Sequence, residues 1–130
     1  MARILIVEDE APLRSAMARY LRATGHVIDE VPDGRRAVRF LESATDVDLV
    51  ITDINMPHMD GIEVIRAIES AAPKVRVLAV SGGGLFPKEM LLAQARHLGA
   101  IATLTKPFEL ARLGEVVDEL LRANTGPSGA

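Results

Sequence analysis

The chain contains no cysteine and no tryptophan, and only one tyrosine and three phenylalanines occur among its 130 residues. Without cysteine it can form neither a disulfide framework nor a thiolate metal site, which suits a cytoplasmic address. With 48% hydrophobic residues but so few aromatic ones, the core must be built from aliphatic side chains. The length is close to the commonest size of a single domain and is sufficient to bury such a core.

The chain also lacks an excess of positive charge and any long apolar run. Its formal net charge of −3 gives no electrostatic reason to expect binding to nucleic acid or to a membrane surface. No apolar run approaches the length of a membrane span, and the stretch before Glu8 is too short for a signal peptide. We therefore expect a soluble, cytoplasmic domain.

Two common kinds of site have no counterpart in the sequence. The histidines at 26, 58 and 97 lie outside metal-ligand spacing, and no Ser/His/Asp arrangement is evident. The glycines at 82–84 lack the later Gly-Lys-Ser/Thr of a phosphate-binding loop, so we interpret them as a flexible hinge after Ser81.

Short apolar segments alternate along the chain with segments of helical spacing. We expect strands at 4–7, 26–31, 48–52, 75–80 and 101–105, and helices at 11–23, 34–43, 60–70, 87–98 and 109–122. Gly25 and Gly99 each stand between a helix and a strand, where a left-handed cap favours glycine. The alternation predicts an α/β fold of βα units, and five strands are too few for an eight-stranded barrel, so we expect an open, doubly wound sheet. Residues 1–123 would form the domain and residues 124–130 a disordered tail.

Polar residues follow four of the five expected strands. Glu8 and Asp9 follow the first strand, Asp53 the third, Ser81 the fourth and Lys106 the fifth. Ligands bind to such sheets outside the carboxyl ends of the strands. The sequence therefore predicts that these five side chains share one pocket.

The chemistry of this set favours phosphoryl transfer. Crowded carboxylates raise one another's pKa, and a hard divalent cation such as Mg²⁺ relieves the repulsion with oxygen ligands. A lysine supplies a positive charge for a phosphoryl oxygen, and a serine supplies a hydroxyl donor. We therefore expect Asp53 itself to accept a phosphoryl group.

Four segments, in this order and spacing, resemble the response-regulator receiver domain of two-component signalling over residues 3–122. The segments are "ILIVEDE", "LVITDINMPHMDGIEVIRAI", "VLAVSGGG" and "TLTKPFEL". The resemblance implies a flavodoxin-like (βα)5 fold with strand order 2-1-3-4-5. It also implies a stand-alone switch that takes its phosphoryl group from a histidine kinase or histidine phosphotransfer protein and acts on a downstream protein. We expect no nucleic-acid or membrane partner, and a monomer or weak dimer.

The same resemblance implies a role for each site residue. Asp53 would be the phosphoacceptor, Ser81 the hydroxyl that turns toward the phosphoryl group, and Lys106 its counter-ion. Mg²⁺ would be bound by Asp9, Asp53 and the backbone carbonyl of Asn55, with Glu8 acting through water. A cis peptide bond is expected between Lys106 and Pro107, since only X-Pro bonds adopt cis readily.

Two other functions fit the sequence less well than this switch. A phosphohydrolase that uses an aspartyl-phosphate intermediate would need a general acid at position 55, where an asparagine has no proton to give. An interaction module with a degraded pocket would have lost some of the five groups, and all are present. We therefore expect no turnover of an external substrate.

Some residues near the motifs are assigned to structural or signalling roles. Asp60 is expected to cap the third helix with Glu63 completing a capping box, and Met56 and Met59 are expected to pack. His58 is interpreted as an exposed loop residue. Thr103 stands where the resembling domains commonly have a moving aromatic residue. A threonine sweeps little apolar area, so we expect the segment 81–86 and the helix start after Pro87 to move instead.

Overall fold

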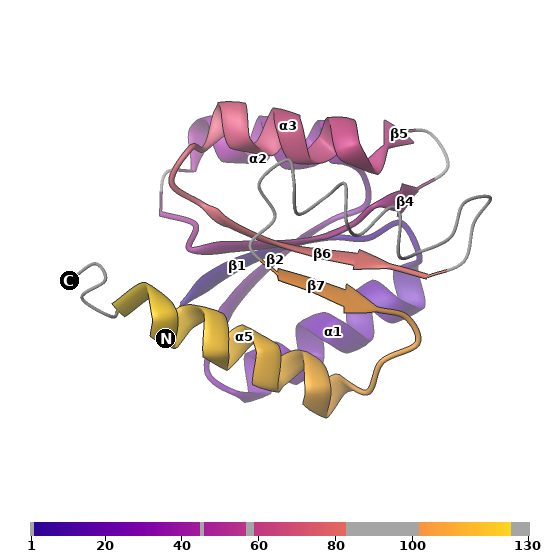
Figure 1. Cartoon of the computed structure of the whole chain (residues 1–130), viewed down its shortest axis with the longest axis vertical. Coiled ribbons are helices and arrows are strands. Elements are labelled where there is room, and N and C mark those ends of the chain that lie inside the picture. The colour runs from indigo at the N-terminus through magenta and orange to yellow at the C-terminus, as the bar shows by residue number, and fades with distance from the viewer. Residues whose placement is uncertain (1, 45, 57–58, 83–101, 126–130) are drawn as a thin grey trace.

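The computed structural model describes residues 2–44, 46–56, 59–82 and 102–125 (Figure 1). A sheet of five parallel strands has the order β2-β1-β3-β6-β7. Its strands are β1 (Arg3–Val7), β2 (Val27–Val31), β3 (Leu49–Asp53), β6 (Arg76–Ser81) and β7 (Ala102–Thr105). Counted along the chain, this is the expected order 2-1-3-4-5, which is confirmed together with the α/β doubly wound class.

Helices cover both faces of this sheet. They are α1 (Ala11–Ala23), α2 (Gly34–Ser43), α3 (Gly61–Ala71) and α5 (Leu110–Thr125). Figure 1 shows α2 and α3 on one face and α1 and α5 on the other. The helix expected at 87–98 and the cap expected at Gly99 lie outside the described residues. None of the helices in the described ranges is long and apolar enough to cross a membrane.

The strands alternate their side chains between two aliphatic clusters, as the period of two requires. Ile4 and Ile6 pack in the cluster under α1 and α5, whereas Leu5 and Val7 pack in the cluster under α2 and α3. The helices contribute small and branched aliphatic side chains to both clusters. The largest fully buried side chains include no aromatic residue in the described part of the chain, as the composition predicted.

The helix ends follow local sequence signals. Pro12 stands in the first turn of α1, and the side chain of Asp33 accepts a 2.8 Å hydrogen bond from the Arg36 amide at the start of α2. Gly25, after α1, has a φ of 100°, which confirms the left-handed conformation expected there.

Two local features differ from the expectation. A short antiparallel hairpin, β4 (Asn55–Met56) with β5 (Met59–Asp60), follows β3 and was not expected, because two-residue strands leave no periodicity to detect. Helix α5 continues to Thr125, three residues beyond the helix end expected at residue 122. Asparagine and threonine weaken a helix only slightly, whereas the following Gly126 and Pro127 are strong helix terminators.

Candidate functional site

The strand register brings the predicted site residues to one edge of the sheet. Val7 is level with Thr52, so Glu8 and Asp53 directly follow paired positions of the neighbouring strands β1 and β3. Asp53 is level with Val80, and the next residue of β6, Ser81, is level with Thr105 of β7. All these residues stand at the carboxyl ends of parallel strands. The structure therefore brings these residues to one edge of the sheet, as the sequence predicted, and their function at that edge stays a prediction.

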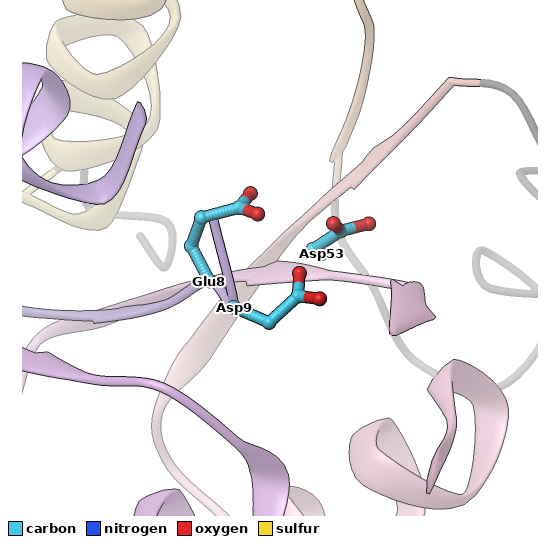
Figure 2. Close-up of side chains that lie close together, drawn as sticks. All are labelled: Glu8, Asp9 and Asp53. Carbon is cyan, nitrogen blue, oxygen red and sulfur yellow. The ribbon is translucent and has the colours of Figure 1, made fainter. Parts of the chain in front are cut away.

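Three carboxylates converge at this edge. Single carboxylate oxygens of Glu8, Asp9 and Asp53 all lie within 4.8 Å of one another. Figure 2 shows the side chains of Glu8 and Asp9 directed toward that of Asp53. Glu8 and Asp53 are almost fully buried, at 1% and 3% relative exposure, while Asp9 is exposed to solvent. The cluster thus combines two buried carboxylates with one that is exposed to solvent.

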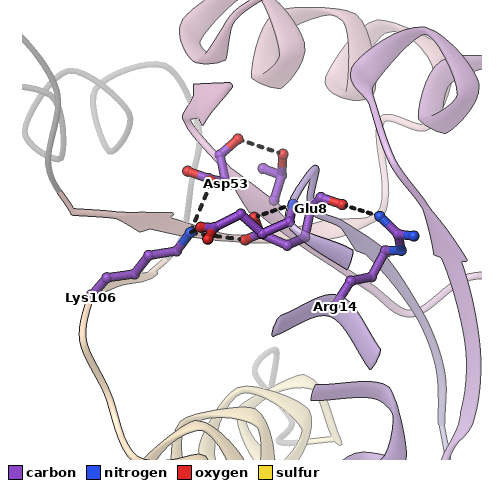
Figure 3. A network of polar contacts seen from close by, with 6 residues as sticks. Glu8, Arg14, Asp53 and Lys106 are labelled. Carbon is purple, nitrogen blue, oxygen red and sulfur yellow. Dashed lines mark hydrogen bonds and ion pairs between the residues drawn. The ribbon is translucent and has the colours of Figure 1, made fainter. Parts of the chain in front are cut away.

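Lys106 supplies the positive charge at the cluster. Its Nζ lies 3.0 Å from Glu8 Oε1 and 3.0 Å from Asp53 Oδ2 (Figure 3). A third carboxylate, that of Glu10, lies 3.4 Å from the same nitrogen. The Lys106 side chain is 16% exposed, so it meets the two buried carboxylates where water screens them little.

Burial and mutual repulsion perturb the ionisable groups of the site. Burial and, after it, the nearby charge of Asp53 together raise the pKa of Glu8 to about 7, against the opposing effects of the Glu10 amide and Lys106. Burial alone would lower the pKa of Lys106, but its hydrogen bonds and attraction to Asp53 and then Glu8 outweigh burial and raise it. Without a further cation, the site therefore holds a permanently charged lysine beside a carboxyl group that titrates near neutral pH.

Backbone contacts fix the chain around Lys106. Its amide donates a 2.8 Å hydrogen bond to the carbonyl oxygen of Ser81. The peptide bond to Pro107 is cis, as expected. Gly82 lies against Lys106: a Cβ on Gly82 would overlap the Cβ of Lys106 and stand 2.9 Å from its carbonyl oxygen. Gly82 is therefore needed for close approach, and the hinge interpretation stays a prediction for Gly83 and Gly84, which lie outside the described residues.

The remaining predicted residues are placed but their roles stay predictions. Ser81 is fully buried as the last residue of β6. No buried side-chain nitrogen or oxygen in the described part of the chain lacks a hydrogen-bond partner. Asn55 begins β4, two residues after Asp53, where its carbonyl was expected to act. Thr103 lies in β7 level with Ala79. The segment expected to move after Gly82 lies outside the described residues, as does His58.

Asp60 immediately precedes α3, which begins at Gly61, so it stands at the expected capping position. The side-chain contacts of the predicted capping box lie outside what the structure describes, as does the packing of Met56 and Met59.

Two residues at the site were missed by the sequence analysis. Glu10 precedes α1 without capping it through its side chain, which instead pairs with Lys106. Arg14 donates a 2.7 Å hydrogen bond to the main-chain carbonyl of Glu8. Glu10 continues the acidic pair and was detectable as a third acid. Arg14 is one of several arginines along α1, and nothing in the sequence distinguishes it from the others.

The donor set suits a hard divalent cation. Such ions prefer carboxylate oxygens, and Mg²⁺ commonly uses one or two of them and keeps several waters. Glu8, Asp9 and Asp53 offer three carboxylates, and among them Asp9 is exposed to solvent. The ammonium of Lys106 already balances part of this charge.

The chain is similar to one protein family over most of its length. The model of the response regulator receiver domain matches residues 4–118. A transcriptional regulatory protein PdtaR from Mycobacterium tuberculosis is 39% identical over 112 residues, which are 85% of this chain and 52% of that protein. A sensor kinase CckA from Brucella abortus is 35% identical over 124 residues, 92% of this chain and 12% of the kinase. This chain thus spans about half of the first relative and a small part of the second.

A solved structure has the same fold. The response regulator receiver domain protein from Clostridium thermocellum superposes with a TM-score of 0.85 at 25% identity, covering 95% of this chain and 97% of that one.

Proposed function

Because the chain belongs to the response-regulator receiver domain family of two-component signalling, we propose that Asp53 accepts a phosphoryl group and that the domain signals by a conformational change. The donor would be a histidine kinase or a histidine phosphotransfer protein, and the reaction would require Mg²⁺ and take place in the cytoplasm. The observation that carries this proposal is the buried Asp53 carboxylate, held 3.0 Å from Lys106 beside two further acids.

Transfer onto Asp53 forms one bond and breaks one. A carboxylate oxygen of Asp53 attacks phosphorus, and the bond from phosphorus to the donor atom breaks. The electron pair leaves with the donor, which is an imidazole nitrogen for a phosphohistidine. Lys106 faces the attacked carboxylate and can neutralise charge on a phosphoryl oxygen. Ser81 would provide a hydroxyl hydrogen bond to another.

The acidic cluster is proposed to hold the cation. Asp9, Asp53 and the carbonyl of Asn55 would bind it directly, and Glu8 would act through water. The positive charge held by these residues would help to neutralise the charge that develops on the phosphoryl oxygens. We expect weak binding, because Mg²⁺ retains most of its water. Asp9→Ala should abolish the response to a Mg²⁺ titration, and a larger loss in Glu8→Ala would contradict this assignment.

Phosphoryl labelling tests the proposal directly. The protein is incubated with Mg²⁺ and a small acyl phosphate and analysed by intact-protein mass spectrometry. The expected result is the addition of one phosphoryl group that is stable in acid and lost in base. Asp53→Asn should fold and take no label. Labelling of Asp53→Asn at another residue would contradict the proposed acceptor.

The same experiment separates the switch from an enzyme. A phosphohydrolase would release phosphate continuously from many organic phosphates and would not stop at one equivalent. The amide at position 55 favours the switch, because it cannot protonate a leaving group at neutral pH. We therefore propose that the domain catalyses only its own phosphorylation and dephosphorylation.

A further inference from the structure

Arg14 contacts the acidic cluster of Glu8, Asp9 and Asp53 from the side opposite Lys106. It stands in the first turn of α1 and donates from a guanidinium nitrogen to the main-chain carbonyl of Glu8 over 2.7 Å. Figure 3 shows Arg14 and Lys106 approaching Glu8 from opposite sides. The side chain is only 20% exposed. A charged donor at this distance and burial makes a stronger hydrogen bond than a neutral one.

The hydrogen bond from Arg14 completes a set that holds Glu8 in place. The Glu8 amide donates to the carbonyl of Val31 over 3.2 Å, which ties it to β2. The Glu8 side chain accepts from the Glu10 amide over 3.1 Å and pairs with Lys106. The carbonyl of Glu8 belongs to the peptide group that leads into Asp9. Whatever orients that carbonyl therefore also orients the main chain between the two acids.

We infer that Arg14 is a positioning residue for the acidic cluster. By holding the Glu8 carbonyl, it sets where the carboxylates of Glu8 and Asp9 lie relative to Asp53. This inference rests on the proposed function, since these carboxylates are the ones proposed to hold Mg²⁺. Groups that orient metal ligands commonly affect metal affinity although they do not touch the ion.

A simpler role for Arg14 would be an ion pair between α1 and β2. Its Nε lies 3.7 Å from Glu30 Oε1. Arg22, two turns further along α1, makes the same kind of pair: a guanidinium nitrogen lies 3.2 Å from Glu30 Oε2. Arg22 also donates to a main-chain carbonyl, that of Ile28, over 3.0 Å. Both arginines pair with Glu30 and donate to a main-chain carbonyl, but of the two only Arg14 bonds to a residue of the acidic cluster. Arg22 is thus a matched control.

The positive charge of Arg14 and its hydrogen bond to Glu8 predict opposite changes in Mg²⁺ affinity when Arg14 is removed. A positive charge near a cation site repels the cation, so its loss should tighten Mg²⁺ binding by charge alone. Loss of the hydrogen bond to Glu8 should loosen the arrangement of Glu8 and Asp9 and weaken binding. The direction of the change therefore decides between the two effects.

The experiment is a Mg²⁺ titration of the full chain followed by NMR at the main-chain amides of Asp9 and Asp53, without a phosphoryl donor. We expect Arg14→Met to weaken Mg²⁺ binding about three- to tenfold and Arg22→Met to change it by less than about twofold. Arg14→Lys keeps the charge but offers a single compact donor, so it should restore only part of the affinity. Hydrogen exchange of the Glu10 amide should accelerate in Arg14→Met alone.

Each outcome has one interpretation. Unchanged or tighter binding in Arg14→Met overturns the inference, and so does equal weakening in Arg22→Met, which would indicate a shared role through Glu30. Glu30→Gln removes that ion pair and should leave Mg²⁺ affinity unchanged. If Arg14→Met does not fold, Arg14→Lys serves as the test. A Mg²⁺ affinity of Arg14→Lys equal to that of the wild type overturns the inference. A wild-type protein that binds no Mg²⁺ and takes no label refutes the proposed function itself, and the inference falls with it.

Discussion

Gly82 and Lys106 approach each other so closely that position 82 has no room for a side chain. A Cβ there would overlap the Cβ of Lys106 and lie 3.1 Å from its Cα. The obstructing atoms are mostly main chain or next to it, so a side-chain rotation cannot relieve the overlap.

Gly82→Ala should therefore displace Lys106 and destabilise the end of β6. We expect a loss of about 1–3 kcal/mol in the free energy of unfolding, typical of forced overpacking. Phosphoryl labelling should slow at the same time. Urea denaturation measures the first effect and the labelling time course the second. A Gly82→Ala variant with the stability and labelling rate of the wild type would contradict this prediction, and would show that the chain after β6 moves easily away from the chain after β7.

Lys106→Met should destabilise the protein and increase the stabilisation that Mg²⁺ provides. Removing the ammonium leaves the buried carboxylates of Glu8 and Asp53 close together with no positive charge between them. Breaking a buried ion pair by removing one partner lowers the free energy of unfolding by about 3–5 kcal/mol. Mg²⁺ should recover more stability in this variant than in the wild type, because it replaces the missing positive charge. Thermal melts with and without Mg²⁺ test this, and Lys74→Met is a control at an exposed lysine. An equal effect of Mg²⁺ on Lys106→Met and wild type would contradict it.

Without metal, the protein should lose stability as the pH rises from 4.5 to about 7. The pKa of Glu8 is raised from 4.5 to about 7 in the folded protein, so over this interval the folded state keeps a proton that the unfolded state releases. Folding is then favoured at the lower pH, by an amount on the order of a few kcal/mol. Urea midpoints measured in EDTA across this range report the effect.

Glu8→Gln is the control for this pH dependence. Its neutral amide has no proton to lose, so the decline in stability over the same interval should become shallower. Saturating Mg²⁺ should also reduce the decline in the wild type, because it favours the ionised carboxylate. A slope unchanged by Glu8→Gln would assign the effect to other groups.

Glu10→Gln should speed labelling by a small anionic donor. The Glu10 carboxylate is 66% exposed at the pocket and pairs with Lys106, so it both repels the donor and competes for the ammonium. We expect an increase of roughly two- to fivefold at low ionic strength that shrinks as salt screens the charge. Glu115→Gln is a matched control, because Glu115 is also 66% exposed and pairs with Arg112 of its own helix. An equal increase in both variants would mean that only net charge matters.

The fold and the pocket followed from the sequence to the extent that they depend on periodicity and on strand ends. Alternating apolar segments and the acids after them predicted the sheet and the edge at which Glu8, Asp53 and Lys106 meet, because parallel strands end at one side. The antiparallel pair β4 and β5 was not predicted, since strands of two residues are too short to show a period. The steric need for Gly82 also escaped prediction, because it depends on Lys106, which lies far away in the sequence.

Arg14 illustrates the same limit at the level of contacts. Its position in the first turn of α1 was predictable, but its choice of the Glu8 carbonyl depends on where β2 and the turn after β1 lie. Such contacts arise from tertiary placement and leave no pattern of their own in a single sequence.

The carboxylates and the ammonium of the acidic cluster come from strands that differ in their number of paired neighbours. Glu8 follows β1 and Asp53 ends β3, and each of these strands pairs with a neighbour on both sides. Lys106 follows β7, an edge strand that pairs only with β6 among the described strands. Edge elements with few partners open at lower free energy than central ones. A local opening that began at β7 would withdraw the ammonium and leave the carboxylates in place. A cation would be attracted more strongly to that opened form, so metal binding and the loosening of this edge would favour each other by thermodynamic linkage.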